Sequence, residues 1–336
     1  MRAPVYVYDP TTTDSQSKVR GIGRYLQVLR ENTPSDWIFT SSLNDIPSHA
    51  ILIQPFYTFY QSPLITKRIT DRQIAVIHDV IPFKYKAHFP IGIKAWFYSF
   101  LQKSNLRLFD QIITDSEVSR ADIQSFLKIP KEKVSILYPT LARCFWNASR
   151  QHSSHGDYLI YVGDGTWNKN LSKLAIALKR TEATCMFVGK IFEDTNPDHY
   201  MHPWQEDLRL FFKEAQNQKQ FIFTGFVSDE ELINLYSKAT YNLSLSHDEG
   251  FGFSFVEAAA CGCPSLLNDK PIFHEIAEDC AEFVDANNTD AVVVKIKQLM
   301  SDKKRRDEMS SKALEQSKKY NTESFKRRLQ EVIYPY

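Results

Sequence analysis

The chain has 336 residues, of which 43% are hydrophobic, and its formal net charge at pH 7 is +1. This length and composition can fill the cores of two α/β domains, whereas no apolar run approaches the roughly 20 residues that a membrane-spanning helix needs. The segment MRAPVYVYDPTTT lacks the apolar core of a signal peptide, so a cytoplasmic protein is expected.

The charge is unevenly distributed along the chain. Residues 1–150 hold 19 Lys and Arg against 12 Asp and Glu, a net charge of +7, whereas residues 151–336 hold 22 against 28, a net charge of −6. The basic first half suggests an anionic ligand there, although a surface bias without functional meaning would look the same. Nucleic acid is not expected as a partner, because no helix-turn-helix, zinc-finger or RNP-like motif accompanies the charge.

In the first half of the chain, apolar runs alternate with amphipathic segments. Strand-like runs cover residues 5–9, 50–55, 73–79, 111–116 and 134–139, and helical patterns cover residues 23–31 and 93–109. Such alternation predicts a parallel sheet with helices on both faces.

A polar stretch rich in Ser and His, residues 148–157, predicts an interdomain linker. Beyond it the alternation restarts, with strand-like runs at 158–164, 184–190, 220–226 and 241–246 and helical patterns at 170–180 and 228–239. The fold class predicted from these patterns is α/β, with two doubly wound, Rossmann-like domains facing a central cleft. The five cysteines are odd in number and lack the spacing of a typical zinc pair, so buried free thiols are expected.

The strongest functional signal is the segment HDEGFGFSFVEAAACGCPSLL. Glu249 precedes a turn of Gly250, Phe251 and Gly252, and Glu257 follows on a helix of small residues. Glycines let the backbone approach a ligand, and a helix N-terminus favours a phosphate. One carboxylate can accept sugar hydroxyls and the other a ribose diol, which predicts a nucleotide-sugar site. A turn of this kind also occurs where it only packs a strand against a helix.

This segment resembles the donor-site signature of retaining glycosyltransferase family four, in which two Glu separated by seven residues are followed by Ala-x-Ala-x-Gly-x-Pro. Here that tail runs from Glu257 to Pro264. The resemblance implies the GT-B fold. It places an acceptor-side domain at residues 1–150, a nucleotide-sugar-binding domain at 151–319, and a last helix, within 320–336, that crosses back to the first domain.

The segment YVGDGTWNKNL resembles a second family motif. A strand ends at Gly163 and a helix begins near Asn170, so Lys169 lies where a cation beside backbone donors could neutralise a diphosphate leaving group. The family usually has Arg where this chain has Asn168. The resemblance implies that Gly163, Asn168 and Lys169 line the donor site, together with Phe253 of the first motif. An ordinary solvated lysine at a helix start is the alternative.

Two more motifs lie in the first half of the chain. In the first of them, Gly21 and Gly23, with Arg24 beside them, resemble the family's Gly-rich loop after the first strand and predict a turn whose N–H groups approach a phosphate.

The second is His78, next to Asp79, which follows a strand at the edge where open α/β sheets bind ligands. The resemblance implies that His78 contacts hydroxyls of the transferred sugar, and a satisfied core pair is the alternative.

Residues 84–103 interleave lysines with aromatic residues. This composition suits the headgroup layer of a membrane, and it allows a peripheral contact with the cytoplasmic face of the inner membrane. A helix packed on the first sheet would account for most of the same aromatic residues, and this packed helix is the expected arrangement.

Together the motifs imply, by resemblance, a retaining hexosyltransferase of bacterial surface polysaccharide synthesis. It would move a hexose, with mannose from GDP-mannose as the expected case, from a GDP- or UDP-linked donor to a glycan or lipid-linked acceptor. Glu249, Lys169 and His78 would be catalytic. No metal or cofactor is expected, because the sequence has no Asp-x-Asp triplet. The alternatives are a UDP-sugar-dependent transferase, an epimerase or phosphorylase of similar architecture, and a catalytically silent homologue that acts as a partner subunit.

Overall fold

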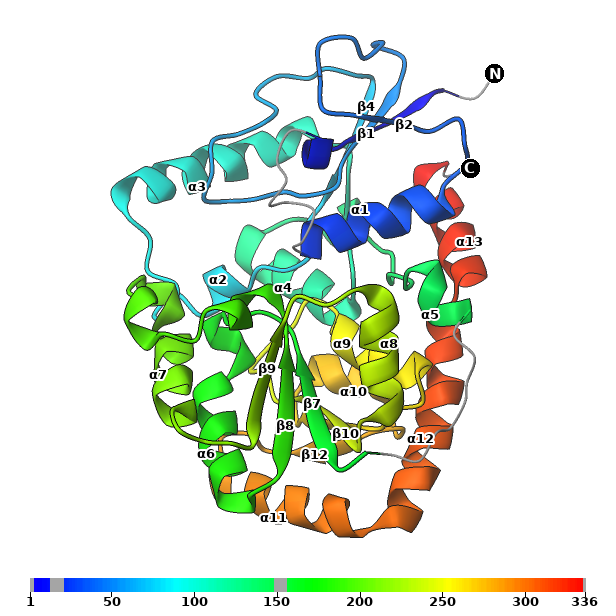
Figure 1. The fold of residues 1–336 in the computed structure, drawn as a ribbon. Helices are drawn as coiled ribbons and strands as arrows, with labels where there is room; N and C mark the ends of the chain where they lie inside the picture. Colours follow the sequence, from blue (N-terminus) through cyan, green and yellow to red (C-terminus); the bar gives the residue numbers. More distant parts are fainter. Residues whose placement is uncertain (1–2, 13–20, 148–155, 335–336) are drawn as a thin grey trace. The chain divides into compact units, whose positions relative to one another are not determined.

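The chain forms two compact units in the computed structural model, which describes residues 3–12, 21–147 and 156–334 (Figure 1). Unit 1 comprises Met1–Ala142 and Thr322–Tyr336, and unit 2 comprises Arg143–Asn321. Each unit contains one six-stranded parallel sheet. The expected parallel, doubly wound sheets are therefore confirmed.

The boundary between the units lies between Ala142 and Arg143, earlier than the residue 150 that the sequence suggests. The reason is the short helix α5 (Arg143–Asn147), which packs against helices α8 and α9 of unit 2. Most of the expected linker at 148–157 lies outside the described residues.

The sheet of unit 1 has the strand order β2-β1-β3-β4-β5-β6. Its strands are β1 (Val5–Tyr8), β2 (Ile38–Thr40), β3 (Ile51–Gln54), β4 (Arg72–Val76), β5 (Gln111–Thr114) and β6 (Val134–Ile136). Strand β2 was not predicted, because it is three residues long, lies at an edge and carries an exposed Ile38 in place of a buried apolar run.

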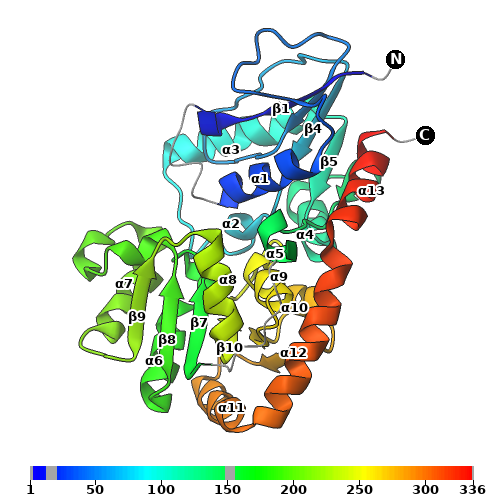
Figure 2. The ribbon, with the colours of Figure 1, turned by 45° about the vertical axis from the view of Figure 1, so that its right-hand side comes forward.

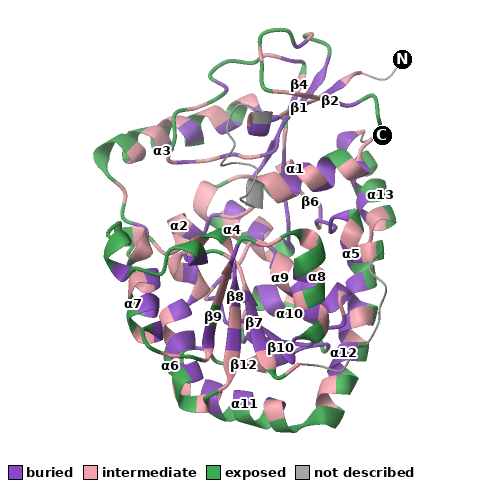
Figure 3. Ribbon diagram, in the orientation of Figure 1, coloured by how far each residue is buried: buried purple, intermediate pink, exposed green. Residues whose placement is uncertain are grey.

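Helices cover both faces of this sheet. On one face, apolar residues of α1 (Gly21–Asn32) and α13 (Thr322–Ile333) pack with Val5, Ile53 and Val76. On the other face, α2 (Ile81–Lys84) and α4 (Glu117–Leu127) contribute to a second cluster. The remaining helix of unit 1 is α3 (Ile93–Asn105). The strands are mostly buried, as Figure 3 shows, and their neighbouring residues belong alternately to the two clusters, which therefore lie on opposite faces.

The sheet of unit 2 has the order β12-β11-β10-β7-β8-β9. Its strands are β7 (Tyr158–Val162), β8 (Thr184–Val188), β9 (Phe221–Gly225), β10 (Tyr241–Ser244), β11 (Ser265–Asn268) and β12 (Glu282–Val284). Numbered within the unit, the order is 3-2-1-4-5-6, that of dinucleotide-binding sheets. The direction of winding reverses between β7 and β10, and ligands of such sheets bind at the carboxyl ends of the strands at that point.

Seven helices complete the described part of unit 2 besides α5 (Figure 2). Apolar residues of α6 (Leu171–Thr181), α7 (Glu206–Ala215) and α11 (Thr289–Ser301) form one large core cluster with the strands. Helix α9 (Phe253–Ala260) contacts β10 and β11, and its neighbours are α8 (Asp229–Lys238) and α12 (Lys303–Ser317). Helix α10 (Pro271–Ala277) follows β11.

The structure bears on the cysteines and on membrane-spanning helices. All five cysteines are free thiols; Cys185, Cys263 and Cys280 are buried, whereas Cys144 and Cys261 are partly exposed. In the part of the chain that the structure describes, no helix combines the length and the apolar character needed to cross a bilayer.

Candidate active site

The carboxyl ends of three neighbouring strands in unit 2 carry glycines. Gly163 follows β7, Gly189 follows β8 and Gly225 ends β9, and the Gly189 N–H donates to the Gly225 carbonyl at 2.9 Å. Gly189 has a φ of 151°, and a Cβ on it would lie 2.2 Å from the Gly163 carbonyl oxygen. No side chain fits at Gly189, so this edge of the sheet is built from closely spaced backbone.

A shielded ion pair lies where the winding of this sheet reverses. Lys169 ends a short 3-10 helix after β7, and Glu249 follows β10. The Lys169 Nζ lies 2.8 and 2.9 Å from the two carboxylate oxygens of Glu249, and the side chains are 18% and 13% exposed. The hydroxyl of Ser246 donates to the same carboxylate at 2.6 Å. The fold thus joins two expected catalytic residues that are 80 positions apart in the sequence.

Asn168, next to the lysine, belongs to the interior. Its Nδ2 donates to the Asp248 carbonyl at 3.0 Å, and its Oδ1 accepts from the Thr166 hydroxyl at 2.8 Å. The residue is 6% exposed, and its carbonyl accepts from the His247 N–H. A buried amide must satisfy its hydrogen bonds internally. This side chain ties the two loops of the ion pair together, and its expected contact with the donor stays a prediction.

The N-terminus of α6, which follows Lys169, is capped from within the protein. A carboxylate oxygen of Asp207 accepts from the N–H groups of Leu171 and Ser172 at 2.9 and 3.3 Å. Burial raises the pKa of Asp207, against hydrogen bonds from Ser172 and Leu171 that lower it. Free backbone donors were expected beside Lys169, but the N–H groups of Leu171 and Ser172 are already bonded. Asp207, on α7, supplies the negative charge that a helix N-terminus favours.

The turn before α9 needs glycine at its last position. Gly252 precedes the first residue of the helix with a φ of 93°, and a Cβ there would lie 2.8 Å from the Ile276 Cδ1. Phe251 is 3% exposed, and its ring packs 5.3 Å from those of Phe253 and Tyr320. The side chain of Phe251 is therefore part of the core, and its expected place in the donor site stays a prediction. Gly250 and Phe253 remain partly exposed.

Glu257 lies on α9 and is only 5% exposed. The hydroxyl of Tyr236 lies 3.4 Å from its Oε2, and burial together with this carboxylate raises the pKa of Tyr236. Small residues follow Glu257 on the helix, namely Ala258, Ala259 and Ala260. Only a small part of the carboxylate reaches the surface, and its contact with a ribose stays a prediction.

In unit 1, both ring nitrogens of His78 face oxygen atoms. Nδ1 lies 2.6 Å from Oδ2 of Asp115, and Nε2 lies 3.1 Å from the Pro55 carbonyl. A carboxylate and a carbonyl only accept, so both contacts favour the ring with hydrogen on both nitrogens. Burial lowers the pKa of His78, but the charge and hydrogen bond of Asp115 outweigh it, so that the pKa is raised. His78 thus forms a buried pair, with Asp115 as the carboxylate, while 26% of its side chain stays exposed.

Helix α1 reaches the same histidine. The ring of Tyr25 meets that of His78 edge-on at 4.7 Å, and Phe56 packs on it at 5.4 Å. Gly21 and Gly23 lie in the first turn of α1 and not in a separate turn, because burial of Tyr25, Leu26 and Leu29 favours helix throughout this segment.

The loop before α1, with Arg20, lies outside the described residues. A guanidinium nitrogen of Arg24 donates to the Gln27 side chain at 3.3 Å. The expected phosphate contact of Gly21, Gly23 and Arg24 therefore stays a prediction.

Several residues of these two sites were not predicted from sequence. Asp115 directly follows strand β5, which pairs with β4, and pairing these two strands would have brought it to His78. Gly189 follows an apolar strand in the segment TCMFVGK, which is a recognisable signal. Asp207 lies in a helix with no motif of its own, and its role as a cap could not have been found from a sequence pattern.

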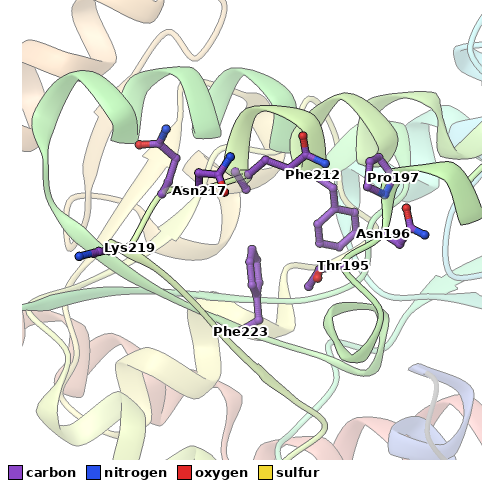
Figure 4. A pocket seen from close by; sticks show the side chains of 10 residues that line it. Thr195, Asn196, Pro197, Phe212, Asn217, Lys219 and Phe223 are labelled. Atoms are coloured by element: carbon purple, nitrogen blue, oxygen red, sulfur yellow. The ribbon is translucent and has the colours of Figure 1, made fainter.

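A separate pocket of about 800 Å³ opens elsewhere in unit 2 (Figure 4). Phe212 and Phe223 line it together with Asn196, Pro197 and the loop that precedes β9. None of its ten lining residues is an expected site residue.

The two sheets and their connections define the GT-B fold. The chain resembles Anabaena HepE, solved with UDP and glucose, with a TM-score of 0.71 and 14% identity over 100% of both chains. It also resembles WaaG, a glycosyltransferase involved in lipopolysaccharide biosynthesis, with a TM-score of 0.68 and 11% identity over 99% of this chain and 100% of that one.

The sequence identifies the family within this fold. Residues 145–316, slightly more than half of the chain, match the model of the glycosyl transferases group 1, and the chain belongs to that family. It is 26% identical to the O-antigen chain mannosyltransferase RfbU of Salmonella typhimurium over 64% of this chain and 57% of that protein. It is 24% identical to O-antigen chain mannosyltransferase B of Escherichia coli over 76% of this chain and 68% of that protein.

Proposed function

We propose that the protein transfers a hexose from a nucleotide-sugar to a glycan or lipid-linked acceptor in bacterial surface polysaccharide synthesis, with mannose from GDP-mannose as the donor. The names of its relatives support this proposal. Two of them are O-antigen mannosyltransferases, and a third, 28% identical over 42% of this chain, is a GDP-mannose:cellobiosyl-diphosphopolyprenol alpha-mannosyltransferase of Xanthomonas oryzae.

The observation that carries the proposal is the Lys169–Glu249 pair at the reversal point of the second sheet. Sheets with this strand order bind nucleotides at that point. Glu249 would accept hydroxyls of the sugar, and Lys169 would then turn to the diphosphate. The exchange leaves neither side chain without a partner, which matters because both are mostly shielded from water.

We propose a retaining reaction that needs no metal ion. The acceptor would attack the face from which the diphosphate leaves, and a phosphate oxygen would take its proton, so no protein nucleophile is required. Lys169 and the N-terminus of α9 would stabilise the negative charge that grows on the leaving group. His78 would donate from Nε2 to a sugar hydroxyl, which requires that nitrogen to leave the Pro55 carbonyl.

A nucleotide panel tests the proposal. Thermal unfolding is measured with GDP, UDP and ADP, and nucleotide release is measured with GDP-mannose and with UDP-glucose, each with and without EDTA. A nucleotide at 100 times its dissociation constant should add about 2.7 kcal/mol to the free energy of unfolding. We expect stabilisation by GDP, and nucleotide release from GDP-mannose that survives EDTA.

Other outcomes identify the alternatives. Stabilisation by UDP, with release from UDP-glucose, would replace the donor with a UDP-sugar. Loss of turnover in EDTA, restored by manganese or magnesium, would contradict the metal-independent reaction. Nucleotide binding without turnover from either sugar, in the presence of lysate lipids as a source of acceptor, would favour a catalytically silent homologue.

A further inference from the structure

Helix α3 in unit 1 turns its apolar residues outward. Four large apolar side chains are strongly exposed: Ile93 (89%), Trp96 (63%), Phe97 (51%) and Phe100 (64%). Their spacing of three, four and seven residues places them on one face of the helix. Figure 3 shows exposed residues along α3, whereas the strands of the same unit are mostly buried. A helix that packs on a sheet places its apolar residues in the opposite direction.

The two buried residues of α3 are polar. Ser99 and Gln102 are 7% and 2% exposed. The Gln102 side chain donates to the Gln61 carbonyl at 3.2 Å, and the backbone carbonyl of Gln102 accepts from the Tyr57 hydroxyl at 2.5 Å. The Asn105 side chain donates to the Ile65 carbonyl at 3.0 Å. These hydrogen bonds hold the helix in place.

Core packing therefore does not account for the aromatic residues of α3. Neither of the two apolar clusters described for unit 1 includes a side chain from this helix. The expectation that residues 84–103 pack as a helix on the sheet is wrong for the large apolar face of α3, because these side chains are exposed while the buried residues of the helix are polar.

The surface around this face is basic. Residues 84–109 contain five basic residues and no acidic one, namely Lys84, Lys86, Lys94, Lys103 and Arg107. Lys86, Lys94 and Lys103 are exposed, whereas Lys84 pairs with Asp122 at 2.9 Å. Burial, and then the charge of Lys86, lowers the pKa of Lys103, so these two cations lie near each other. A face that combines aromatic residues with neighbouring cations suits an anionic partner that also has an apolar layer.

We infer that α3 docks on the surface of an anionic lipid bilayer, with Ile93, Trp96 and Phe100 among the acyl chains just below the headgroups. Lys86, Lys94 and Lys103 would meet the lipid phosphates. A second copy of the chain fits less well, because a symmetric contact through this face would bring the same cations together. A neutral glycan would match the aromatic rings but not the cations. The inference is independent of the donor site, which lies in unit 2.

Vesicle binding tests this inference on the full chain. The protein is sedimented with vesicles of phosphatidylcholine, and with vesicles that also contain phosphatidylglycerol, at low and high salt. We expect binding to the anionic vesicles that weakens with salt, and a shift of tryptophan emission to shorter wavelength that is lost in Trp96→Phe. Absence of binding by the wild-type chain would overturn the inference.

Two variants separate the apolar and charged contributions. Trp96→Ser combined with Phe100→Ser should weaken binding by roughly tenfold or more. Reversal of Lys86, Lys94 and Lys103 to Glu should weaken binding to anionic vesicles by about fivefold or more for each lysine, and should abolish the preference for them.

Matched controls come from unit 2. Val294→Ser removes an apolar side chain that is 54% exposed, and Lys219, Lys297 and Lys304 are exposed lysines for a control triple reversal. Both controls should bind vesicles like the wild type, and all variants should keep its nucleotide-dependent thermal shift. Equal binding by the α3 variants and the wild type would contradict the inference. So would a wild-type dimer that Trp96→Ser with Phe100→Ser converts to a monomer, since this face would then be a protein interface.

Discussion

The carboxyl edges of the two sheets are built differently. In unit 2, Lys169 and Glu249 form an ion pair on loops, next to backbone brought close by Gly163 and Gly189. In unit 1, His78 lies between aromatic rings and pairs with Asp115, which is 2% exposed. The first edge holds two opposite charges in one ion pair, whereas the second holds a histidine ring with an oxygen atom at each of its nitrogens.

The difference extends to the atoms around each pair. Glu249 also accepts from Ser246, so its carboxylate keeps a partner when the lysine moves. In unit 1, Oδ1 of Asp115 and the Tyr25 hydroxyl are buried, with no hydrogen-bond partner among the described residues. Burial, and then the charge of Asp115, raises the pKa of Tyr25. We therefore expect substitutions in the ion pair of the first edge to change rate and affinity, and substitution of Asp115 at the second to change stability and its pH dependence.

The largest effect is expected at the first edge. Lys169→Ala should lower turnover by about 100- to 1000-fold, because the lysine meets charge that grows as the bond to phosphate breaks. The free energy of unfolding should change much less, since Ser246 still donates to Glu249. Nucleotide-release kinetics and urea unfolding measure the two effects.

The control for Lys169 is Lys179→Ala, which removes an ion pair of the same 2.8 Å length between exposed side chains. It should leave turnover unchanged. If Lys169→Ala retains turnover but unfolds at much lower urea, the pair is structural and the two edges do not differ as argued.

The next effect concerns the donor nucleotide. Glu257→Ala should weaken nucleotide binding by about 1.5 to 3 kcal/mol, because a charged hydrogen bond to the ribose is lost in both the ground and transition states. Turnover at saturating donor should be less affected. Calorimetric titration with GDP gives the affinity, and Glu257→Gln, which keeps the size of the side chain, should lose less. Unchanged affinity in the folded Ala variant would restrict Glu257 to packing beside Tyr236.

The pair in unit 2 was predictable because its signals are local. Glu249 and Lys169 each lie in a short segment in which a strand end, a glycine and a helix start follow in order, and resemblance to a family supplied their joint role. The alternation of apolar runs likewise gave most strands of both sheets. Strands β11 and β12 were not identified, since one merges with the small-residue segment after α9 and the other is three residues long.

What could not be predicted depends on contacts between distant segments. Asn168 is expected as a ligand contact because of its place beside Lys169, but its hydrogen bond to the Asp248 carbonyl appears only once β7 and β10 are paired. The outward face of α3 was missed for a related reason. A helical pattern shows that apolar residues share a face, but not that Gln61 and Tyr57 offer polar partners to the opposite face.

Asn168 gives the third prediction, an effect on stability at the edge where rate effects are expected. Asn168→Ala should lower the free energy of unfolding by about 1 to 3 kcal/mol, because the Asp248 carbonyl loses a buried donor. Asn168→Arg, which restores the residue usual in the family, should also destabilise, since its 6% exposure leaves no room for a guanidinium.

Urea unfolding measures this effect on stability. The exposed Asn287→Ala is the control and should stay close to the wild type. Tighter nucleotide binding by a stable Asn168→Arg variant would show instead that this position faces the donor.

The smallest effect is expected at His78, because the replacement tested there can still accept a hydrogen bond. Asp115→Asn removes the charge that raises the pKa of His78, so this pKa should fall, as a titration of the ring protons by NMR would show. A raised pKa in the folded state stabilises the protein most below the unfolded value of 6.5, and this contribution is lost as the pH rises through the folded value. The deficit of Asp115→Asn in the free energy of unfolding should therefore be largest below pH 6.5 and shrink above it.

The control is Asp269→Asn, whose carboxylate pairs with His274 at 2.6 Å between exposed side chains and should contribute little. A deficit that does not depend on pH would mean that Asp115 only fills space, and a charged pair with His78 at the edge of unit 1 would then have no basis.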